Sequence, residues 1–378
     1  MTRILLSCGE ASGDLYAGAL ITALRRRDPD LDVFGLGSDH FAAAGGERIA
    51  DFHGLSVTGL TEALAVIPRS LRTLKQLVSA AAKRKPHVAV LIDYPDFNFR
   101  LMARLKRLGI PVVYYISPQL WAWRASRITN MKRGATRVLP IFPFEETLYR
   151  KHQVPVTFVG HPLIDLANAS TTRVEFLGRA RLDPAHPVVA LLPGSRTNEL
   201  ERIAPVMAQA VPLILAQAPG TQFVVARAPN LADRLFEPFG ILGATIRIVE
   251  GQTDDVLNGS DAVVTASGTA TVQTALHGKP MVVLYKLSPM TYRLGRRLAL
   301  VDMYAMVNLI AGRRIVVELI QDGCTPEAVA TETTRLLTDS GYRSQMVAAI
   351  EDVKARLGGP GASDRAAAAI LEVARANG

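Results

Sequence analysis

Short continuous apolar runs recur along the first half of the chain, and amphipathic stretches separate them. Because these runs do not alternate with polar residues, they predict strands that are buried on both faces of a parallel sheet. Residues 13–27 repeat apolar side chains at helical spacing, which predicts a helix after the first strand. The alternation of strand and helix is typical of a doubly wound sheet. The strands expected here are residues 4–7, 32–35, 88–92, 111–116, 137–140 and 157–159.

The same pattern restarts in the second half, after a polar and irregular segment at residues 171–187 that indicates an interdomain region. A helix is expected at residues 198–217, and residues 325–377 are alanine-rich and helical in pattern. The fold class is therefore α/β with two Rossmann-like domains, which we assign to residues 1–165 and 166–345, followed by C-terminal helices. The strands expected in this half are residues 187–192, 222–226, 246–249, 262–265 and 281–285.

Composition narrows the class of partner. A length of 378 residues with 49% hydrophobic residues is enough for two domains with cores of their own. The net charge of +9 indicates an acidic partner: a nucleic acid, an anionic membrane surface or a phosphorylated substrate. Nucleic acid is the weakest of these, since the aromatic content is 6% and no zinc-ligand or helix-turn-helix pattern is evident. Two cysteines, Cys8 and Cys324, form no disulfide framework and indicate a reducing compartment.

Membrane contact is expected at the surface rather than through the bilayer. No apolar run approaches the ~18 residues of a spanning helix, and the first apolar run is too short for a signal peptide. Residues 60–85 carry apolar side chains at helical spacing with basic residues on their flanks. Such a helix can lie on an anionic leaflet, or it can pack on its own sheet with a solvated basic face. The pattern does not choose between these alternatives.

Asp93 and Asp96 stand directly after the apolar run 88–92. Ligands of open α/β sheets bind beyond the carboxyl ends of the strands, so a catalytic acid or base is expected here. Asp93 is the candidate base, and the alternative is a turn residue that bonds its own backbone. Asp96 fits better as the start of a helix near Phe97. Asn98 is a candidate either for a contact with a substrate hydroxyl or for the support of Asp93.

Three glycine-containing loops follow predicted strands. Residues 9–14 open the first helix, where free N–H groups suit anions or hydroxyls, although an ordinary turn capped by Ser12 or Asp14 fits equally. Residues 191–196 end in Arg196, a phosphate candidate whose alternative is a surface arginine. Residues 267–271 place two hydroxyls at a helix start. The paired aspartates at residues 28–32 lie in a polar turn, so we expect no metal site.

Eight motifs in this order resemble lipid-A-disaccharide synthases, inverting glycosyltransferases of glycosyltransferase-B architecture. They are residues 9–14, 93–98, 117–124, 142–145, 159–162, 191–196, 267–271 and 308–314. The resemblance implies two domains facing across a cleft, with the segment 346–378 returning to the first domain. It implies transfer of 2,3-diacylglucosamine from its uridine diphosphate (UDP) conjugate to 2,3-diacylglucosamine 1-phosphate, which gives the β-1,6-linked disaccharide of lipid A. No metal and no cofactor are expected.

The resemblance also assigns residues to this reaction, with Asp93 as the base that deprotonates the acceptor 6-hydroxyl. Substrate contacts are expected from Glu10, Ser12, Gly13, Asp96, Asn98, Trp121, Trp123 and His161. Nucleotide contacts are expected from Gly194, Ser195, Arg196, Ser267, Gly268, Thr269, Gln273, Asn308 and Glu318. The chain departs from the family at Gln273, where a glutamate is expected to hold the ribose. The glutamine amide keeps an acceptor oxygen but lacks the negative charge of a glutamate. Two consequences are open: the nucleotide binds more weakly, or Gln273 contacts only one ribose hydroxyl.

Two other functions compete with this interpretation. One is another UDP-sugar enzyme of the same fold, such as an N-acetylglucosaminyltransferase or a 2-epimerase. The other is a non-catalytic relative that binds a lipid or an anion, with Gln273 as the mark of lost activity. The expected partners are the UDP-sugar donor, the acylated sugar-phosphate acceptor and the cytoplasmic face of the inner membrane, and no nucleic acid. The sequence leaves the oligomeric state open, with a homodimer among the alternatives.

Overall fold

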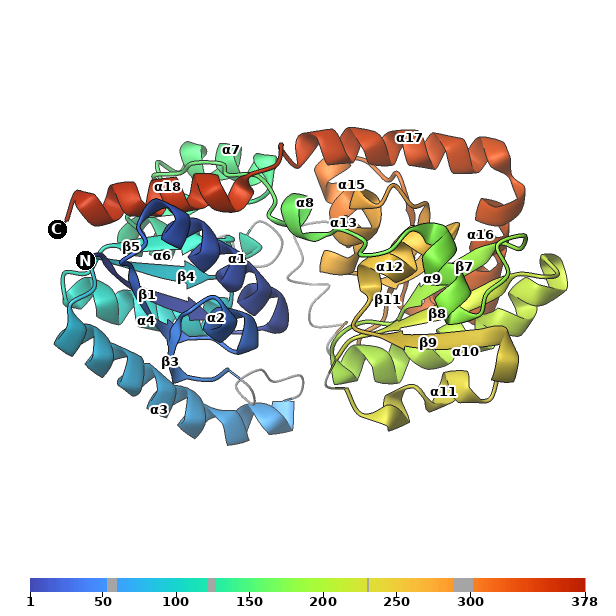
Figure 1. Cartoon of the computed structure of the whole chain (residues 1–378), viewed down its shortest axis with the longest axis horizontal. Helices are drawn as coiled ribbons and strands as arrows, with labels where there is room; N and C mark the ends of the chain where they lie inside the picture. The colour runs from blue at the N-terminus through green and yellow to red at the C-terminus, as the bar shows by residue number, and fades with distance from the viewer. Residues whose placement is uncertain (53–59, 121–126, 230, 289–291, 293–301, 378) are drawn as a thin grey trace. The chain divides into compact units, whose positions relative to one another are not determined.

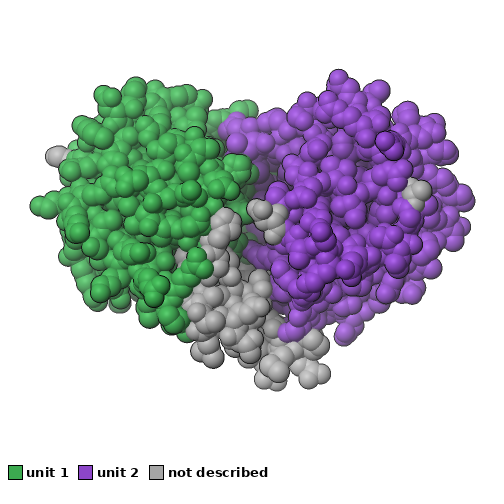
Figure 2. All heavy atoms as spheres, turned by 60° about the horizontal axis from the view of Figure 1, so that its bottom comes forward, with its two compact units in different colours: residues 1–162, 357–378 green, residues 163–356 purple. Residues whose placement is uncertain are grey.

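The computed structural model describes residues 1–52, 60–120, 127–229, 231–288, 292 and 302–377. The chain divides into two compact units (Figure 2). Unit 1 comprises Met1–Pro162 and Leu357–Gly378, and unit 2 comprises Leu163–Arg356. Within the described residues, each unit is built on a six-stranded sheet whose neighbouring strands are all parallel.

The sheet of unit 1 has the strand order β3-β2-β1-β4-β5-β6. Its strands are β1 (Arg3–Cys8), β2 (Asp32–Leu36), β3 (Glu47–Ala50), β4 (Val88–Ile92), β5 (Val112–Tyr115) and β6 (Arg137–Leu139). The helices α3 and α4 cover one face of this sheet, and α1 and α18 cover the other (Figure 1). The helices of the unit are α1 (Ala11–Arg27), α2 (Asp39–Ala43), α3 (Leu60–Arg84), α4 (Pro95–Arg107), α6 (Ile128–Gly134), α7 (Pro143–Lys151) and α18 (Ala362–Arg375).

The sheet of unit 2 repeats this topology with the order β12-β11-β10-β7-β8-β9. Its strands are β7 (Val188–Leu192), β8 (Gln222–Arg227), β9 (Ile246–Glu250), β10 (Ala262–Ala266), β11 (Met281–Tyr285) and β12 (Val317–Ile320). The α-helices of the unit are α8 (Leu163–Leu166), α9 (Arg173–Ala180), α10 (Thr197–Gln217), α11 (Glu237–Gly240), α12 (Thr253–Gly259), α13 (Thr269–Leu276), α15 (Met306–Ala311), α16 (Pro326–Thr338) and α17 (Ser340–Arg356). Both units therefore have the Rossmann strand order, and the predicted fold class is confirmed.

Burial explains why the central strands were predictable. Every residue of β4 is buried, as is every residue of β7 and β10, because helices cover both faces of each sheet. The edge strands β3 and β12 were missed, since their side chains are only partly buried and their sequences are not continuously apolar. The predicted strand at residues 157–159 is wrong: this segment forms no strand, although Val156 makes an isolated bridge with Val138 and the Thr157 N–H donates to the Val138 carbonyl at 3.0 Å.

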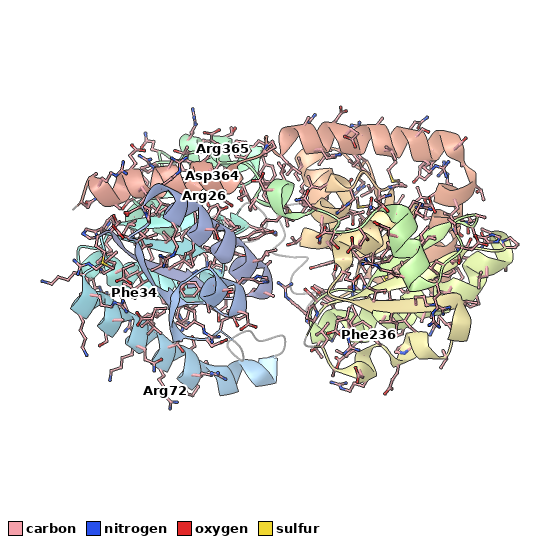
Figure 3. The ribbon with its side chains drawn as sticks, in the orientation of Figure 1. Arg26, Phe34, Arg72, Phe236, Asp364 and Arg365 are labelled. Atoms are coloured by element: carbon pink, nitrogen blue, oxygen red, sulfur yellow. The ribbon has the colours of Figure 1, made fainter. Side chains whose placement is uncertain are left out.

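The chain passes between the units at two points, Pro162 to Leu163 and Arg356 to Leu357. The segment 171–187, predicted as an irregular interdomain region, instead contains α9. A capping box starts this helix, because Thr172 and Glu175 exchange hydrogen bonds between side chain and backbone. The expected boundary at residue 346 falls inside α17, which belongs to unit 2. The terminal helix α18 packs against α1, and Arg26 pairs with Asp364 at 3.0 Å across the two helices (Figure 3).

Candidate active site

Four of the eight motifs follow the strands between which the strand order of each sheet reverses. The reversal lies between β1 and β4 in unit 1, and between β7 and β10 in unit 2. Open α/β sheets bind ligands outside the carboxyl ends of the strands at this switch point. The loops that leave these four strands begin at Gly9, Asp93, Pro193 and Ser267. Sequence motifs that are far apart along the chain therefore belong to two switch points, one in each unit.

Asp93 follows β4 directly and has an unusual backbone conformation. Its φ is +42°, and the φ of Tyr94 is +47°, so two successive residues with side chains adopt the left-handed region. The Asp93 N–H donates to the carbonyl of Ile116 at 3.1 Å, on the neighbouring strand end. The residue is half-buried at the edge of the sheet. A carboxylate is thus held at the switch point of unit 1, where the sequence predicted a base.

Asn98 holds this turn through hydrogen bonds from its buried side chain. Its side chain is fully buried, and its Oδ1 accepts a hydrogen bond from the Ser7 hydroxyl at 2.8 Å. Its Nδ2 donates to the carbonyls of Ile92 at 3.2 Å and Asp93 at 2.9 Å. Burial and these partners occupy both polar atoms, and a contact between Asn98 and substrate stays a prediction. The other alternative, support of Asp93, describes the geometry.

Asp96 has a different environment from Asp93. Helix α4 begins at Pro95 with Tyr94 at the N-cap position, so the helix starts earlier than predicted, and Asp96 lies inside its first turn. The Asp96 side chain is 75% exposed and pairs with Arg127 at 2.7 Å. An acidic residue in the first turn stabilises the helix dipole, which accounts for the aspartate at this position. Its contact with substrate stays a prediction.

The loop that follows β1 is shaped by Gly9 and Asp14. A Cβ atom on Gly9 would lie 2.1 Å from the ring of Tyr94, so a glycine is required for this loop to pack on the Asp93 turn. The buried Asp14 carboxylate accepts hydrogen bonds from the backbone N–H groups of Ser38 at 2.6 Å and His40 at 2.8 Å. Asp14 therefore caps α2 rather than its own helix. Contacts of Glu10, Ser12 and Gly13 with substrate stay predictions.

His161 lies in the core of unit 1. Its ring packs edge-on against Tyr16, with ring centroids 6.3 Å apart, and against Phe142 at 5.4 Å. The residue is 2% exposed, and burial lowers the pKa of the imidazole from 6.5 to about 3. Packing thus covers the ring, and the contact of His161 with substrate stays a prediction. Trp121 and Trp123, also predicted to bind substrate, lie outside the described residues.

The buried His161 predicts a specific dependence of stability on pH. Below pH 6.5 the unfolded chain binds a proton that the folded imidazole takes up only near pH 3, so acid favours unfolding. This site alone then lowers the free energy of unfolding by about 2 kcal/mol between pH 7 and pH 5. We expect urea unfolding at the two pH values to show a smaller loss for His161→Gln than for the wild type. Equal losses would contradict a neutral, buried imidazole.

The loop that follows β7 has the features of an anion site. Gly194 has a φ of +120°, and Arg196 is the N-cap residue of α10. The Ser195 N–H donates to the Glu199 carboxylate at 3.4 Å, and the Arg196 guanidinium pairs with Glu199 at 3.2 Å. The Arg196 side chain is half exposed. Glu199 thus meets the N–H and guanidinium groups that a phosphate would use. Sequence analysis missed Glu199, although a glutamate three residues after an N-cap is a known helix-start signal.

The loop that follows β10 presents a second helix start. Gly268 is the N-cap residue of α13 with a φ of +140°, and within the described residues no atom lies within 4 Å of where its Cβ would be. Thr269 is exposed beside it. The Ser267 hydroxyl donates to the carbonyl of Tyr304 at 2.7 Å. Backbone and Thr269 are therefore accessible to a ligand, whereas Ser267 also holds the segment around Tyr304.

Asn308 and Glu318 hold the segment around Tyr304 through hydrogen bonds. Asn308 is fully buried, and its Oδ1 accepts from the N–H groups of Ile315 and Val316 at 2.7 and 3.0 Å. Its Nδ2 donates to Glu318 at 2.8 Å, and the Glu318 carboxylate accepts from the Ala305 N–H at 2.8 Å. The side chain of Asn308 thus bonds within the protein, and its contact with the nucleotide stays a prediction. Glu318 anchors the start of α15, and its contact with the nucleotide stays a prediction.

Comparison with known proteins identifies the family. A family model described as "Lipid-A-disaccharide synthetase" matches residues 4–373. The lipid-A-disaccharide synthase of Myxococcus xanthus is 44% identical over 372 residues, which cover 98% of this chain and 97% of the relative. The corresponding protein of Geobacter metallireducens is 42% identical over 375 residues, which cover 98% and 97%. The chain belongs to the lipid-A-disaccharide synthase family. It is thus a glycosyltransferase enzyme of lipid A biosynthesis.

Solved structures of other enzymes share the fold of this lipid-A-disaccharide synthase family member. The UDP-GlcNAc 2-epimerase of Neisseria meningitidis, bound to UDP-GlcNAc, has a TM-score of 0.70 at 14% identity and covers 98% of this chain and 100% of its own. Acinetobacter baumannii MurG has a TM-score of 0.58 at 14% identity, with coverage of 98% and 100%. These likenesses show a fold of the glycosyltransferase-B type. Across the described part of the chain, no helix has the length and apolar character needed to cross a membrane.

Gln273, where the resemblance led us to expect a glutamate, has a specific partner in this structure. The Gln273 Nε2 donates to Asp254 Oδ1 at 2.8 Å, and the His277 Nε2 lies 2.8 Å from the same oxygen. A glutamate at position 273 would place a second carboxylate against Asp254, whereas an amide donates a hydrogen bond to it. Sequence analysis missed Asp254 and His277, since Asp254 lies on α12 whereas its partners Gln273 and His277 lie on α13 and at its C-cap. Gln273 is therefore matched to its neighbour Asp254.

Proposed function

We propose that the enzyme transfers 2,3-diacylglucosamine from its UDP conjugate to 2,3-diacylglucosamine 1-phosphate. The product is the β-1,6-linked disaccharide 1-phosphate, and UDP is released. The observation that carries this proposal is the full-length membership of the synthase family together with a carboxylate at the switch point of unit 1. The phosphorylated substrates also agree with the net charge of +9.

Asp93 acts as the general base in this proposal. Its carboxylate takes the proton of the acceptor 6-hydroxyl while that oxygen attacks the anomeric carbon of the donor. The bond between this carbon and the diphosphate oxygen breaks in the same displacement, and the bond electrons leave with UDP. A single displacement inverts the configuration and needs one base rather than the nucleophile and acid/base pair of a retaining enzyme. The position of Asp93 beyond β4 supports this role.

The diphosphate is held by unit 2 without a metal in this proposal. Arg196 supplies a positive charge, and Ser195 supplies an N–H group at the start of α10. The N-terminus of α13 adds N–H groups at Gly268 and Thr269, aligned with a helix dipole. Donors that face the developing negative charge on the leaving group lower the barrier. Glu199 releases Arg196 and Ser195 when the nucleotide binds.

The test of this function compares acceptors. We expect the purified protein to release UDP with 2,3-diacylglucosamine 1-phosphate as acceptor, and to do so far more slowly with unacylated glucosamine 1-phosphate. Efficient use of the water-soluble acceptor would favour another UDP-sugar enzyme of this fold. UDP binding without turnover of either acceptor would favour a non-catalytic relative.

Gln273 predicts the result of restoring the family residue. We expect Gln273→Glu to lower the free energy of unfolding by about 1–3 kcal/mol, because the hydrogen bond to Asp254 is replaced by repulsion between carboxylates. UDP affinity, measured by calorimetry, should not increase. The double variant Gln273→Glu/Asp254→Asn should regain the wild-type stability, since the amide and the carboxylate have exchanged places. Tighter UDP binding by the single variant at full stability would contradict this account.

We propose that α3 attaches the enzyme to the cytoplasmic face of the inner membrane. The C-terminal part of this helix packs into the core through Leu74, Leu77 and Ala81. Earlier in the helix, Ile67 and Leu71 are 46% and 47% exposed. The C-terminal part of α3 therefore agrees with packing on its own sheet, and the earlier part agrees with a helix that lies on an anionic leaflet. The exposed apolar side chains are suited to insertion between lipid headgroups.

The charge of α3 supports the same orientation. Arg72, Lys75 and Lys83 are exposed on the helix, and Arg72 extends from its outer side (Figure 3). Together with Arg84 they line a shallow cavity of about 490 Å³ between α3 and β3. Basic residues near an anionic leaflet contribute about 1 kcal/mol each to binding. The helix thus combines apolar side chains with positive charge on one exposed surface.

Vesicle binding tests this membrane contact. We expect the protein to sediment with vesicles of phosphatidylglycerol and phosphatidylethanolamine, and Ile67→Asp/Leu71→Asp to bind them at least about tenfold more weakly. Each inserted side chain contributes about 1.5–3 kcal/mol when fully buried. The control is Ile241→Asp in unit 2, which removes an isoleucine that is 86% exposed and should leave vesicle binding unchanged. An equal loss in both variants would contradict a role for α3.

A further inference from the structure

The turn that carries Asp93 is held by a network of buried side chains, of which the sequence motifs pointed to Asn98 but not to Ser7 or Tyr114. The left-handed backbone of Asp93 and Tyr94 is unfavourable for residues with a Cβ atom, and such strain persists only where the surroundings fix it. The strain is located at the residue proposed as the base. The groups that fix this turn are therefore candidates for a role in catalysis.

The carbonyl oxygen of Asp93 accepts two hydrogen bonds from side chains. The Tyr114 hydroxyl donates to it at 2.7 Å, and the Asn98 Nδ2 donates at 2.9 Å. Tyr114 lies on β5 and Asn98 on α4, so two different elements converge on one peptide oxygen. The Ser7 hydroxyl, from β1, holds Asn98 in turn at 2.8 Å. Three neighbouring elements thus specify the orientation of this peptide.

All three supporting side chains are inaccessible to solvent. Ser7, Asn98 and Tyr114 each have an exposed fraction of 0%. Burial raises the pKa of Tyr114 well above its usual value, so its hydroxyl keeps its proton and remains a donor at neutral pH. A buried hydrogen-bond network of this kind is rigid, because each polar group has a fixed partner. None of the three can touch a substrate directly.

We propose that Tyr114, Asn98 and Ser7 are positioning residues for the base of the reaction. They hold the Asp93 peptide in its left-handed conformation, so that the carboxylate stays where the acceptor hydroxyl binds. The inference rests on the proposed function, since it assumes that Asp93 is the base. Tyr114 offers the clearest test of this role. Removal of its hydroxyl deletes one of the two hydrogen bonds to the Asp93 carbonyl, while the ring stays in the core.

The test is Tyr114→Phe, with Tyr149→Phe as the matched control. Tyr149 belongs to the same buried cluster, and its hydroxyl bonds Ser117 rather than the Asp93 turn. Both variants lose one buried hydroxyl, so similar falls in Tm are expected. We expect kcat to fall about 10- to 100-fold in Tyr114→Phe, the range caused by small misplacements of a catalytic group, with both KM values changed less than about twofold. Tyr149→Phe should keep the kcat of the wild type.

A double-mutant cycle separates positioning from general damage. In an Asp93→Asn background, Tyr114→Phe should cause no further loss of kcat, because it acts only through the base. An additive loss in that background, or an equal loss in Tyr149→Phe, would overturn the positioning role and leave Asp93 as the base. An Asp93→Asn variant with the kcat of the wild type would instead refute the proposed base, and the positioning inference with it.

Discussion

Asp93→Asn is expected to lower kcat by about 10²- to 10⁴-fold, which is the usual contribution of a positioned general base. Asparagine keeps the size of aspartate and can occupy the same turn, but it cannot accept the proton of the acceptor hydroxyl. UDP affinity should remain that of the wild type, because the residues proposed to bind the nucleotide belong to unit 2 and Asp93 belongs to unit 1. Steady-state kinetics and calorimetry with UDP measure the two quantities separately.

Asp96→Asn provides the comparison for this variant. Asp96 is 75% exposed and paired with Arg127, so its neutralisation should change kcat less than about threefold, as expected of a weak surface ion pair. A large loss of kcat in Asp96→Asn, together with normal turnover by Asp93→Asn, would transfer the role of base to Asp96. Loss of UDP binding in Asp93→Asn would indicate a damaged fold instead of a missing base.

Arg196→Ala is expected to have the second largest effect, which is a loss of kcat/KM for the UDP-sugar donor. A hydrogen bond to a charged group contributes about 1.5–3 kcal/mol, so kcat/KM for the UDP-sugar should fall about 10- to 100-fold. The acceptor KM should change little. Glu199, which pairs with Arg196 in this structure, would then remain beside the diphosphate without its partner and add to the loss.

The matched control for Arg196 is Arg179→Ala, which removes an exposed arginine of unit 2 from α9. The net charge of the two variants is the same, so a general electrostatic attraction of the donor would be weakened equally. We expect Arg179→Ala to keep the donor kcat/KM of the wild type. Equal losses in the two variants would contradict a direct contact between Arg196 and the diphosphate.

The fold was predictable where buried elements have a simple pattern of apolar residues in the sequence. Strands such as β4 and β10 are covered on both faces, so they are continuously apolar and were placed within one or two residues. The edge strands β3 and β12 are less buried, so their sequences do not show a continuous run of apolar residues. The helix α9 was missed because its polar start resembles a loop, although Thr172 and Glu175 have the spacing of a capping box.

The site was predictable at the level of loops and less so at the level of side chains. Strand ends and strand order bring Asp93 and Arg196 to the switch points, and this follows from topology. Topology does not determine whether a polar side chain points toward a ligand or into the core. Asn98 and Asn308 stand in functional motifs, yet both are buried and bond the backbone. Gln273 is explained only by Asp254, which lies on another helix.

The proposed reaction joins two acylated sugars with loss of UDP. The most direct test incubates the purified protein with UDP-2,3-diacylglucosamine and 2,3-diacylglucosamine 1-phosphate, and then measures UDP and disaccharide from the same reaction. We predict equal amounts of the two products and a β-1,6 linkage between the sugars. UDP formed without disaccharide, or an unchanged pair of substrates alongside intact UDP binding, would contradict the account.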